Sequence, residues 1–187
     1  GKLSDTWARQ YADIPFANEF SYLNGNLKDE YYKEGIYVGY RYFDSFNVEP
    51  AYPFGFGLSY TDFRLTSAGV SLEGSKVTVK VNVTNTGNRF AGAEVAQLYV
   101  SAPNGKLHKE YQQLAAFEKT GVLEPGSREV LDLSFDLRTV ASYREEDGCF
   151  VLEPGDYVLR LGNSSRNTVV VGVVQIVAVE VRRTAQT

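Results

Sequence analysis

Strict alternation of apolar and polar residues is the strongest pattern in the chain. Residues 76–84 read Lys-Val-Thr-Val-Lys-Val-Asn-Val-Thr, so every second side chain is a valine. A period of two predicts a strand with one buried and one exposed face. Residues 129–136 alternate in the same way after an irregular start. Both segments are therefore predicted to be strands of an antiparallel sheet.

Further segments between residues 64 and 181 also favour strands, and turn residues separate them. The turns contain Asn-Thr-Gly-Asn, Pro-Asn-Gly and Pro-Gly sequences, which interrupt regular structure. The additional strand candidates are residues 64–72 at an edge, 94–101, 112–117, 149–152, 156–161 and 169–181. Short strands at a spacing of roughly ten residues are typical of a sandwich. The predicted fold class is all-β, with an antiparallel β-sandwich at residues 62–182.

The first sixty residues have a different composition. Of the 25 Phe, Trp and Tyr residues in the chain, 17 fall within residues 7–63. Residues 35–43 look strand-like because of their β-branched and aromatic content, but the region as a whole lacks the periodic apolar pattern of a separate core. So many aromatic side chains would exceed the apolar patch that a monomer tolerates. We therefore expect residues 1–61 to form a largely irregular docking segment that lies against the sandwich or another domain.

The aromatic cluster allows more than one function. An interdomain interface is favoured, with Arg41 and Asp44 able to pair within it. The alternative is a carbohydrate-binding surface, since Tyr and Trp faces stack on sugar rings; residues 31–42 or the sandwich loops would form it. A third alternative, an adhesion-type sandwich, has only the fold in its favour.

Net charge and hydropathy exclude several classes of partner. Among the 187 residues, 19 Lys and Arg stand against 23 Asp and Glu, for a net charge of −4. This balance argues against nucleic-acid and membrane-surface partners, which need clustered basic residues. Since no apolar run approaches the ~20 residues of a membrane span and no signal peptide opens the chain, a cytoplasmic location is favoured.

Catalytic and metal-binding chemistry has little support in the sequence. His108 is the only histidine and Cys149 the only cysteine, and both are expected to be structural or solvated rather than a catalytic pair. No zinc site, calcium loop or nucleotide-binding loop is recognisable, so no cofactor or metal is expected. Carboxylates remain, because glycoside hydrolysis needs two of them. The sequence gives no reason to pair any of the candidates, which are Asp29, Glu30, Glu34 and Asp44.

Several long motifs resemble the family 3 glycoside hydrolases. Residues 32–44 read Tyr-Lys-Glu-Gly-Ile-Tyr-Val-Gly-Tyr-Arg-Tyr-Phe-Asp and residues 52–61 read Tyr-Pro-Phe-Gly-Phe-Gly-Leu-Ser-Tyr-Thr. Both resemble the end of the α/β-sandwich domain of those enzymes, and Gly-Lys-Leu-Ser-Asp-Thr-Trp at residues 1–7 is similar to the stretch before it. Residues 93–100 and 154–165 resemble their fibronectin type III-like domain, which implies that the predicted sandwich is of the fibronectin type III or immunoglobulin-like kind. The matching motifs occur in the right order over nearly the whole chain.

The resemblance implies a module without catalytic residues. In the family, the nucleophile is an Asp of a (β/α)8 barrel in a Ser-Asp-Trp context, and the acid/base Glu precedes the segment that residues 1–7 resemble. No position of this chain matches either motif, so no catalytic residue is assigned. The implied parent hydrolyses terminal β-linked glucose, or xylose, by a retaining mechanism. Its barrel and α/β-sandwich domain would be the partners of this module; oligosaccharide is a further candidate partner.

The resemblance also suggests how the chain is divided. Residues 1–61 would be the tail of the α/β-sandwich domain, residues 62–182 the sandwich, and residues 183–187 a tail or the start of a linker. Whether the barrel precedes or follows this segment stays open, as do the sugar, the linkage and the oligomeric state. If the chain is expressed alone, residues 8–30 are predicted to be poorly ordered or held by a neighbouring copy, because their partner surface is absent.

Overall fold

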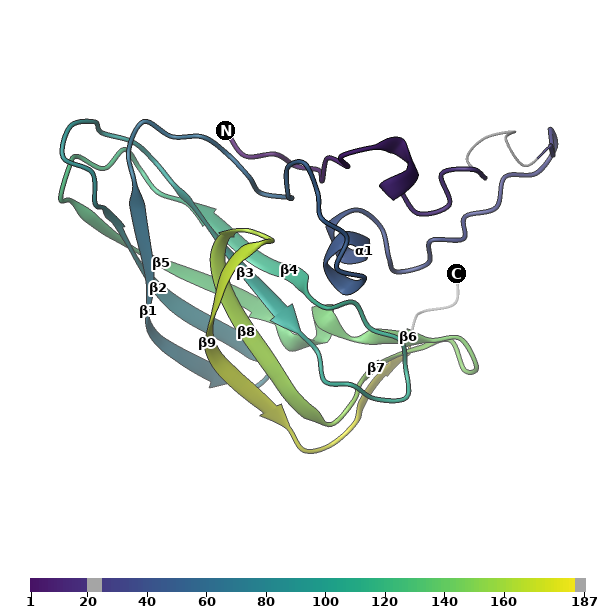
Figure 1. The fold of residues 1–187 in the computed structure, drawn as a ribbon. Coiled ribbons are helices and arrows are strands. Elements are labelled where there is room, and N and C mark those ends of the chain that lie inside the picture. Colours follow the sequence, from purple (N-terminus) through teal and green to yellow (C-terminus); the bar gives the residue numbers. More distant parts are fainter. Residues whose placement is uncertain (20–24, 184–187) are drawn as a thin grey trace.

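A computed structural model describes residues 1–19 and 25–183, and it consists mainly of strands (Figure 1). The strands are β1 (Phe63–Glu73), β2 (Lys76–Asn85), β3 (Val95–Ser101), β4 (Gln113–Lys119), β5 (Arg128–Asp136), β6 (Ser142–Arg144), β7 (Cys149–Leu152), β8 (Gly155–Ser164), β9 (Asn167–Ile176) and β10 (Glu180–Arg183). The short helices are η1 (Tyr11–Asp13), α1 (Tyr40–Ser45) and η3 (Leu137–Val140). The predicted all-β fold class is confirmed.

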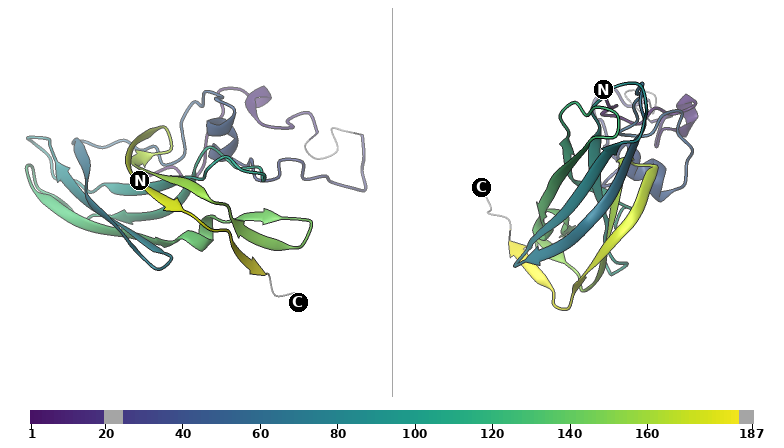
Figure 2. Two further views of the ribbon diagram at one scale, coloured as in Figure 1. Left: turned by 90° about the horizontal axis from the view of Figure 1, so that it is seen from below. Right: turned by 90° about the vertical axis from the view of Figure 1, so that its left-hand side faces the viewer.

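Two sheets form the sandwich and a third, smaller one lies beside it. One main sheet has the strand order β1-β2-β5 and the other β4-β3-β8-β9, while the small sheet has the order β10-β7-β6. All pairings among the described strands are antiparallel. Figure 2 shows the two main sheets face to face, with the docking segment along one side.

The alternating valines of β2 form the centre of the core. Four residues of this strand, Val77, Val79, Val81 and Val83, are fully buried. The polar residues between them, such as Lys80, point to the opposite face of the sheet and are partly or fully exposed. They pack with inward-facing leucines of the opposite sheet in a single cluster. Burying a valine side chain contributes roughly 1.5–3 kcal/mol. The alternation in the sequence therefore has its expected cause.

Strand β3 departs from this pattern because it is buried on both faces. Ala96, Leu98 and Val100 point into the core, while Gln97 and Tyr99 point to the outer face of the four-stranded sheet and are also buried. An outer face of a sandwich strand normally meets water. Here the docking segment covers it.

The prediction of strand-like structure at residues 35–43 is wrong, because residues 35–39 form turns and irregular structure rather than a strand. Residues 40–45 form the helix α1, which begins after Gly39 at a φ of +57°. Tyr40, Phe43 and Asp44 lie on one face of this helix because they are three and four positions apart. This face packs on the sandwich, and that tertiary contact outweighs the β propensity of the segment.

The prediction for residues 169–181 as one strand is also wrong. Strand β9 ends at Ile176, and β10 pairs with β7 in a different sheet. A further strand, β6, was not predicted; it has only three residues, too few for a period to show. Residues 20–24, inside the stretch predicted to be poorly ordered, and residues 184–187, most of the predicted tail, lie outside the described residues.

One buried carboxylate holds the loop at residues 102–112 against the sandwich. Glu153 accepts hydrogen bonds from the backbone N–H groups of Lys106 (2.7 Å) and Leu107 (3.3 Å) and pairs with the ammonium of Lys109. Burial opposes ionisation of Glu153, but these three donors together hold its pKa below the ordinary value. Position 105 next to this carboxylate requires glycine, because a Cβ atom there would lie 2.3 Å from the Glu153 carboxylate.

This carboxylate predicts a stability that is lost in acid. The pKa of Glu153 is lower in the folded than in the unfolded chain, so its contribution is present above the ordinary value of 4.5 and is lost as the pH falls through the folded-state pKa. We expect the free energy of unfolding of Glu153→Gln, measured by urea titration from pH 7 to 3, to fall less steeply below pH 4.5 than that of the original chain. Glu118→Gln, on the exposed end of β4, controls for the loss of one charge. Parallel acid profiles for all three proteins would contradict the assignment.

Candidate docking surface

The docking segment, residues 1–61, contacts the sandwich where the backbone of Gly55 lies close to the side chain of Gln97. Gly55 has a φ of +81°, and a Cβ placed on it would lie 2.3 Å from the amide oxygen of Gln97. Gln97 donates to the carbonyl oxygens of Asn163 (2.7 Å) and Gly55 (3.4 Å). Its amide oxygen accepts a 2.6 Å hydrogen bond from the Tyr99 hydroxyl. Burial raises the pKa of Tyr99, so the phenol stays protonated and keeps this bond.

Aromatic rings cover the same outer face. Tyr40 of α1 lies between Phe54, at a centroid distance of 4.8 Å, and Tyr99, at 5.9 Å in an edge-to-face arrangement. Its hydroxyl accepts a 2.8 Å hydrogen bond from the backbone N–H of Leu114 in β4. Such aromatic pairs contribute about 0.5–1.5 kcal/mol beyond their buried area.

An ion pair fixes α1 over the turn between β8 and β9. The Nε atom of Arg166 lies 2.6 Å from Oδ1 of Asp44, whose side chain is only 3% exposed. Arg166 also donates to the carbonyl oxygens of Phe43 (2.7 Å) and Val48 (2.8 Å). Gln112 donates to Asp44 at 3.0 Å. Burial raises the pKa of Asp44, although Gln112 and Arg166 act in the opposite direction.

The first seven residues bind both the end of the docking segment and the sandwich. Leu3 donates its N–H to Phe56 (2.8 Å) and accepts from the N–H of Gly55 (2.8 Å), and Trp7 forms a β-bridge with Tyr52. The ammonium of Lys2 lies 2.7 Å from the buried carboxylate of Glu94, the residue just before β3. The beginning and end of the docking segment are therefore bound to each other and to the sandwich.

The docking segment also carries many exposed apolar residues. Leu27, Tyr32, Leu58 and Tyr60 are each more than 80% exposed. We define the docking surface as the exposed large apolar residues of the described part of this segment, apart from Ile36, which lines a separate groove; they are Trp7, Tyr11, Ile14, Phe16, Leu27, Tyr31, Tyr32, Val38, Phe46, Tyr52, Leu58 and Tyr60. Figure 1 shows residues 25–36, the projecting arm, extending beyond the sandwich. A groove of about 500 Å³ lies between the arm and residues 11–19.

Of the four carboxylates considered for catalysis, only Glu30 and Glu34 line the groove between the arm and residues 11–19. His108 is exposed in the loop at residues 102–112, while Cys149 is buried in β7 and donates to the carbonyl oxygen of Asp147 (3.3 Å). Asp29, Glu30 and Glu34 all lie on the projecting arm. Asp44, in contrast, pairs with Arg166 of the sandwich. Within residues 1–19 and 25–183, no three His, Cys, Asp or Glu side chains are arranged to hold a metal ion. The same part of the chain contains no helix of the length and apolar character that a membrane span requires.

The pairing of Arg41 with Asp44 within the cluster was predicted wrongly. Asp44 binds Arg166, and Arg41 lies 3.8 Å from Glu110. Sequence reasoning also missed Gln97 and Gln112 as interface residues. A polar Gln97 within the apolar run Val-Ala-Gln-Leu-Tyr-Val was the one available signal, since apolar residues in succession are typical of a strand covered on both faces.

The close approach at Gly55 predicts a specific loss of stability. Gly55→Ala forces a non-glycine residue to a positive φ and a Cβ against Gln97, which three hydrogen bonds hold in place. We expect it to lower the free energy of unfolding by about 2–4 kcal/mol, measured by urea denaturation. Gly126→Ala is the matched control, because Gly126 has a φ of +79° and nothing within 4 Å of its Cβ position. Equal losses in both variants would show that the contact with Gln97 does not matter.

Comparisons with known proteins agree with this architecture. Residues 94–165 match the family model described as a fibronectin type III-like domain. A β-glucosidase from Kluyveromyces marxianus is 39% identical over 88% of this chain, which spans 19% of that protein. The solved β-glucosidase from Paenibacillus barengoltzii superposes with a TM-score of 0.92 at 42% identity, over 100% of this chain and 21% of the other.

A third relative carries the family designation. The solved GH3 β-glucosidase from Bifidobacterium adolescentis has a TM-score of 0.81 and 32% identity, over 94% of this chain and 26% of the other. The chain spans about a fifth of the length of the curated relatives it matches. In sequence and fold the chain therefore corresponds to a segment of the family 3 β-glucosidases that it matches, and residues 94–165 match a fibronectin type III-like domain.

Proposed function

We propose that this chain is the non-catalytic structural module of its parent enzyme and that the docking segment joins the sandwich to the catalytic domains. One observation carries this proposal: some apolar residues of the docking segment are covered by the sandwich, whereas many others are exposed. Tyr40 packs on Tyr99 of the sandwich and on Phe54, whereas Tyr32 and Leu58 are 88% and 87% exposed. Exposed apolar residues in such number are typical of an interface.

The partners follow from the family. We propose that the docking surface contacts the (β/α)8 barrel and the α/β-sandwich domain of the parent, with residues 1–61 as the tail of the latter. The parent would hydrolyse terminal β-linked sugars by a retaining mechanism with two carboxylates, supplied by those domains. A cytoplasmic location stays a prediction from the sequence.

Carbohydrate binding is the second candidate function, but the predicted surface at residues 31–42 is not a single face. Tyr31 and Tyr32 are exposed on the arm, whereas Tyr37 donates to the carbonyl oxygen of Lys109 (3.3 Å) and Tyr40 is packed on Tyr99. The aromatic residues of this stretch therefore divide between the two sides of the docking segment. A different part of the molecule suits a sugar better, as described below.

The structural role predicts assembly from separate pieces. The 187-residue chain, mixed with the remainder of the parent expressed as a second polypeptide, should bind it and restore hydrolysis of an aryl β-glucoside. Tyr32→Ala combined with Leu58→Ala should weaken the association, measured by calorimetry, at least about tenfold, because both side chains would be buried at the contact. Leu72→Ala on β1, outside the docking surface and 45% exposed, is the control.

Two results would contradict the structural role. The first is that the variant with both substitutions binds the remainder of the parent as tightly as the control variant does. The other is hydrolysis of the aryl β-glucoside by the 187-residue chain alone, since a module without a pair of catalytic carboxylates cannot perform it.

A further inference from the structure

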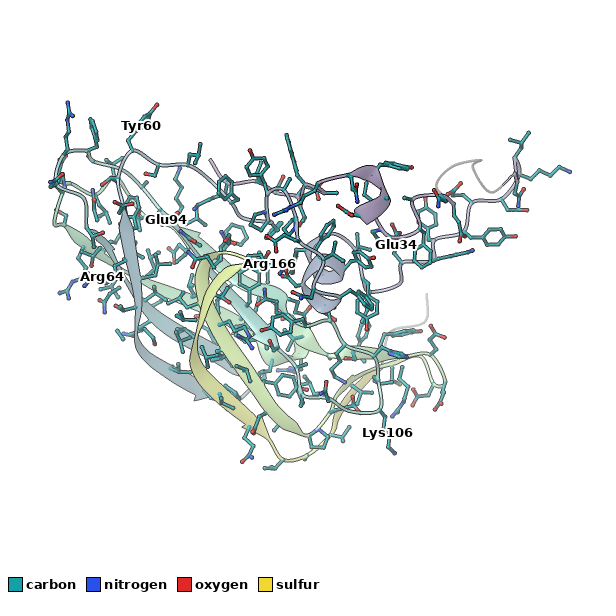
Figure 3. The ribbon with its side chains drawn as sticks, viewed as in Figure 1. Glu34, Tyr60, Arg64, Glu94, Lys106 and Arg166 are labelled. Atoms are coloured by element: carbon teal, nitrogen blue, oxygen red, sulfur yellow. The ribbon has the colours of Figure 1, made fainter. Side chains whose placement is uncertain are left out.

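A second, larger groove lies where the docking segment meets the small sheet. This hairpin groove has a volume of about 720 Å³ and lies between residues 33–41, the loop at residues 102–112 and the β6–β7 hairpin. Pockets of about 300–1,000 Å³ are the size that holds small ligands. Figure 3 labels Glu34 on the docking segment and Lys106 on the loop, which both line this groove.

Two aromatic rings of the hairpin line the groove. Tyr143 in β6 and Phe150 in β7 are direct cross-strand partners, with ring centroids 5.2 Å apart. The neighbours of Phe150, Cys149 and Val151, point inward and are buried, so the pleat of the sheet turns the two rings outward. Tyr143 is 51% and Phe150 37% exposed. Open aromatic faces of this kind stack on the C–H faces of sugar rings.

Polar side chains with unused hydrogen-bonding capacity line the rest of the groove. Glu34, Lys106, His108 and Gln113 all line it. Across the part of the chain that the structure describes, their side chains form no hydrogen bond or ion pair with other residues. The carboxylate of Glu34 accepts, the ammonium of Lys106 donates, and the amide of Gln113 does both. Such a mixture suits hydroxyl groups, which donate and accept at once.

Most basic side chains of the groove are already paired. Lys109 pairs with Glu153, Arg144 pairs with Asp147, Lys33 pairs with Glu19, and Arg41 lies 3.8 Å from Glu110. Glu145 and Glu146 also line the groove, so an anionic ligand would find no net positive field there. The wall is also fixed in advance, because the Tyr37 hydroxyl donates to the backbone of Lys109 and holds the docking segment to the loop. Preorganisation of this kind reduces the entropic cost of binding.

We propose that the hairpin groove binds a neutral β-linked gluco-oligosaccharide of two or three rings. Tyr143 and Phe150, whose rings are tilted by 59° to each other, each contact a sugar ring, and Gln113 and Glu34 bind the hydroxyl groups. The choice of a glucan rests on the proposed function of the parent. The binding itself uses only residues of this chain and needs no catalytic step.

The test is a titration of the 187-residue chain, labelled with ¹⁵N, with cellotriose. We expect millimolar affinity and chemical-shift changes concentrated at Gln113, Tyr143 and Phe150. Tyr143→Ala combined with Phe150→Ala should weaken binding at least about tenfold, and Gln113→Ala, which leaves the rings in place, about two- to tenfold. Phe117→Ala, which is 67% exposed on β4 and outside the groove, should bind as the original chain does.

Several outcomes would overturn the proposal. These are an absence of shift changes at millimolar cellotriose, changes concentrated at Tyr31 and Tyr32 instead, or the same loss of affinity in Phe117→Ala. Tighter binding of an anionic uronic acid trimer or of a peptide would show that the ligand class is wrong. Association with the catalytic domains is measured separately, so a failure of this proposal and a failure of the docking proposal are distinguishable.

Discussion

Burial of β3 on both faces is the constraint on which the rest of this structure depends. A sandwich strand with Gln97 and Tyr99 on its outer side needs a cover that satisfies an amide and a phenol without water. The docking segment supplies it, with the backbone of Gly55 against the amide and the ring of Tyr40 against the phenol. A buried amide without partners would cost about 1–3 kcal/mol. The cover is therefore part of the fold of the sandwich.

The polar contacts around α1 set geometry more than they add stability. A buried ion pair such as Asp44–Arg166 loses much of its attraction to desolvation, and the raised pKa of Asp44 has the same cause. Arg166, however, also binds the two carbonyl oxygens at residues 43 and 48, on either side of the end of the helix. These directional bonds fix the helix over the β8–β9 turn. They thereby determine where the projecting arm leaves the sandwich and the angle of the docking surface.

Most strands of the sandwich were predictable because their apolar residues either alternate with polar ones, as in β2 and β5, or form a short apolar run, as in β3. Val77 to Val83 carry this signal most clearly, and the short β6 carries almost none. The helix α1 was missed because its stability comes from contacts with residues more than fifty positions away, such as Tyr99 and Arg166. The close contact of Gly55 with Gln97, the exchange of partner for Asp44 and the hairpin groove likewise join distant segments. No local period can reveal such contacts.

The glycine at position 55 has a consequence for how this protein divides into parts. Composition changes near residue 61, and a domain boundary drawn there separates two kinds of sequence. The hydrogen bonds and ring contacts cross that boundary, from Lys2 to Glu94 and from Gly55 to Gln97. Cooperative units in proteins follow buried contacts rather than composition. The sandwich and the inner side of the docking segment are thus one folding unit, and in the assembled enzyme that unit would transmit force between domains as a rigid joint rather than as a tether.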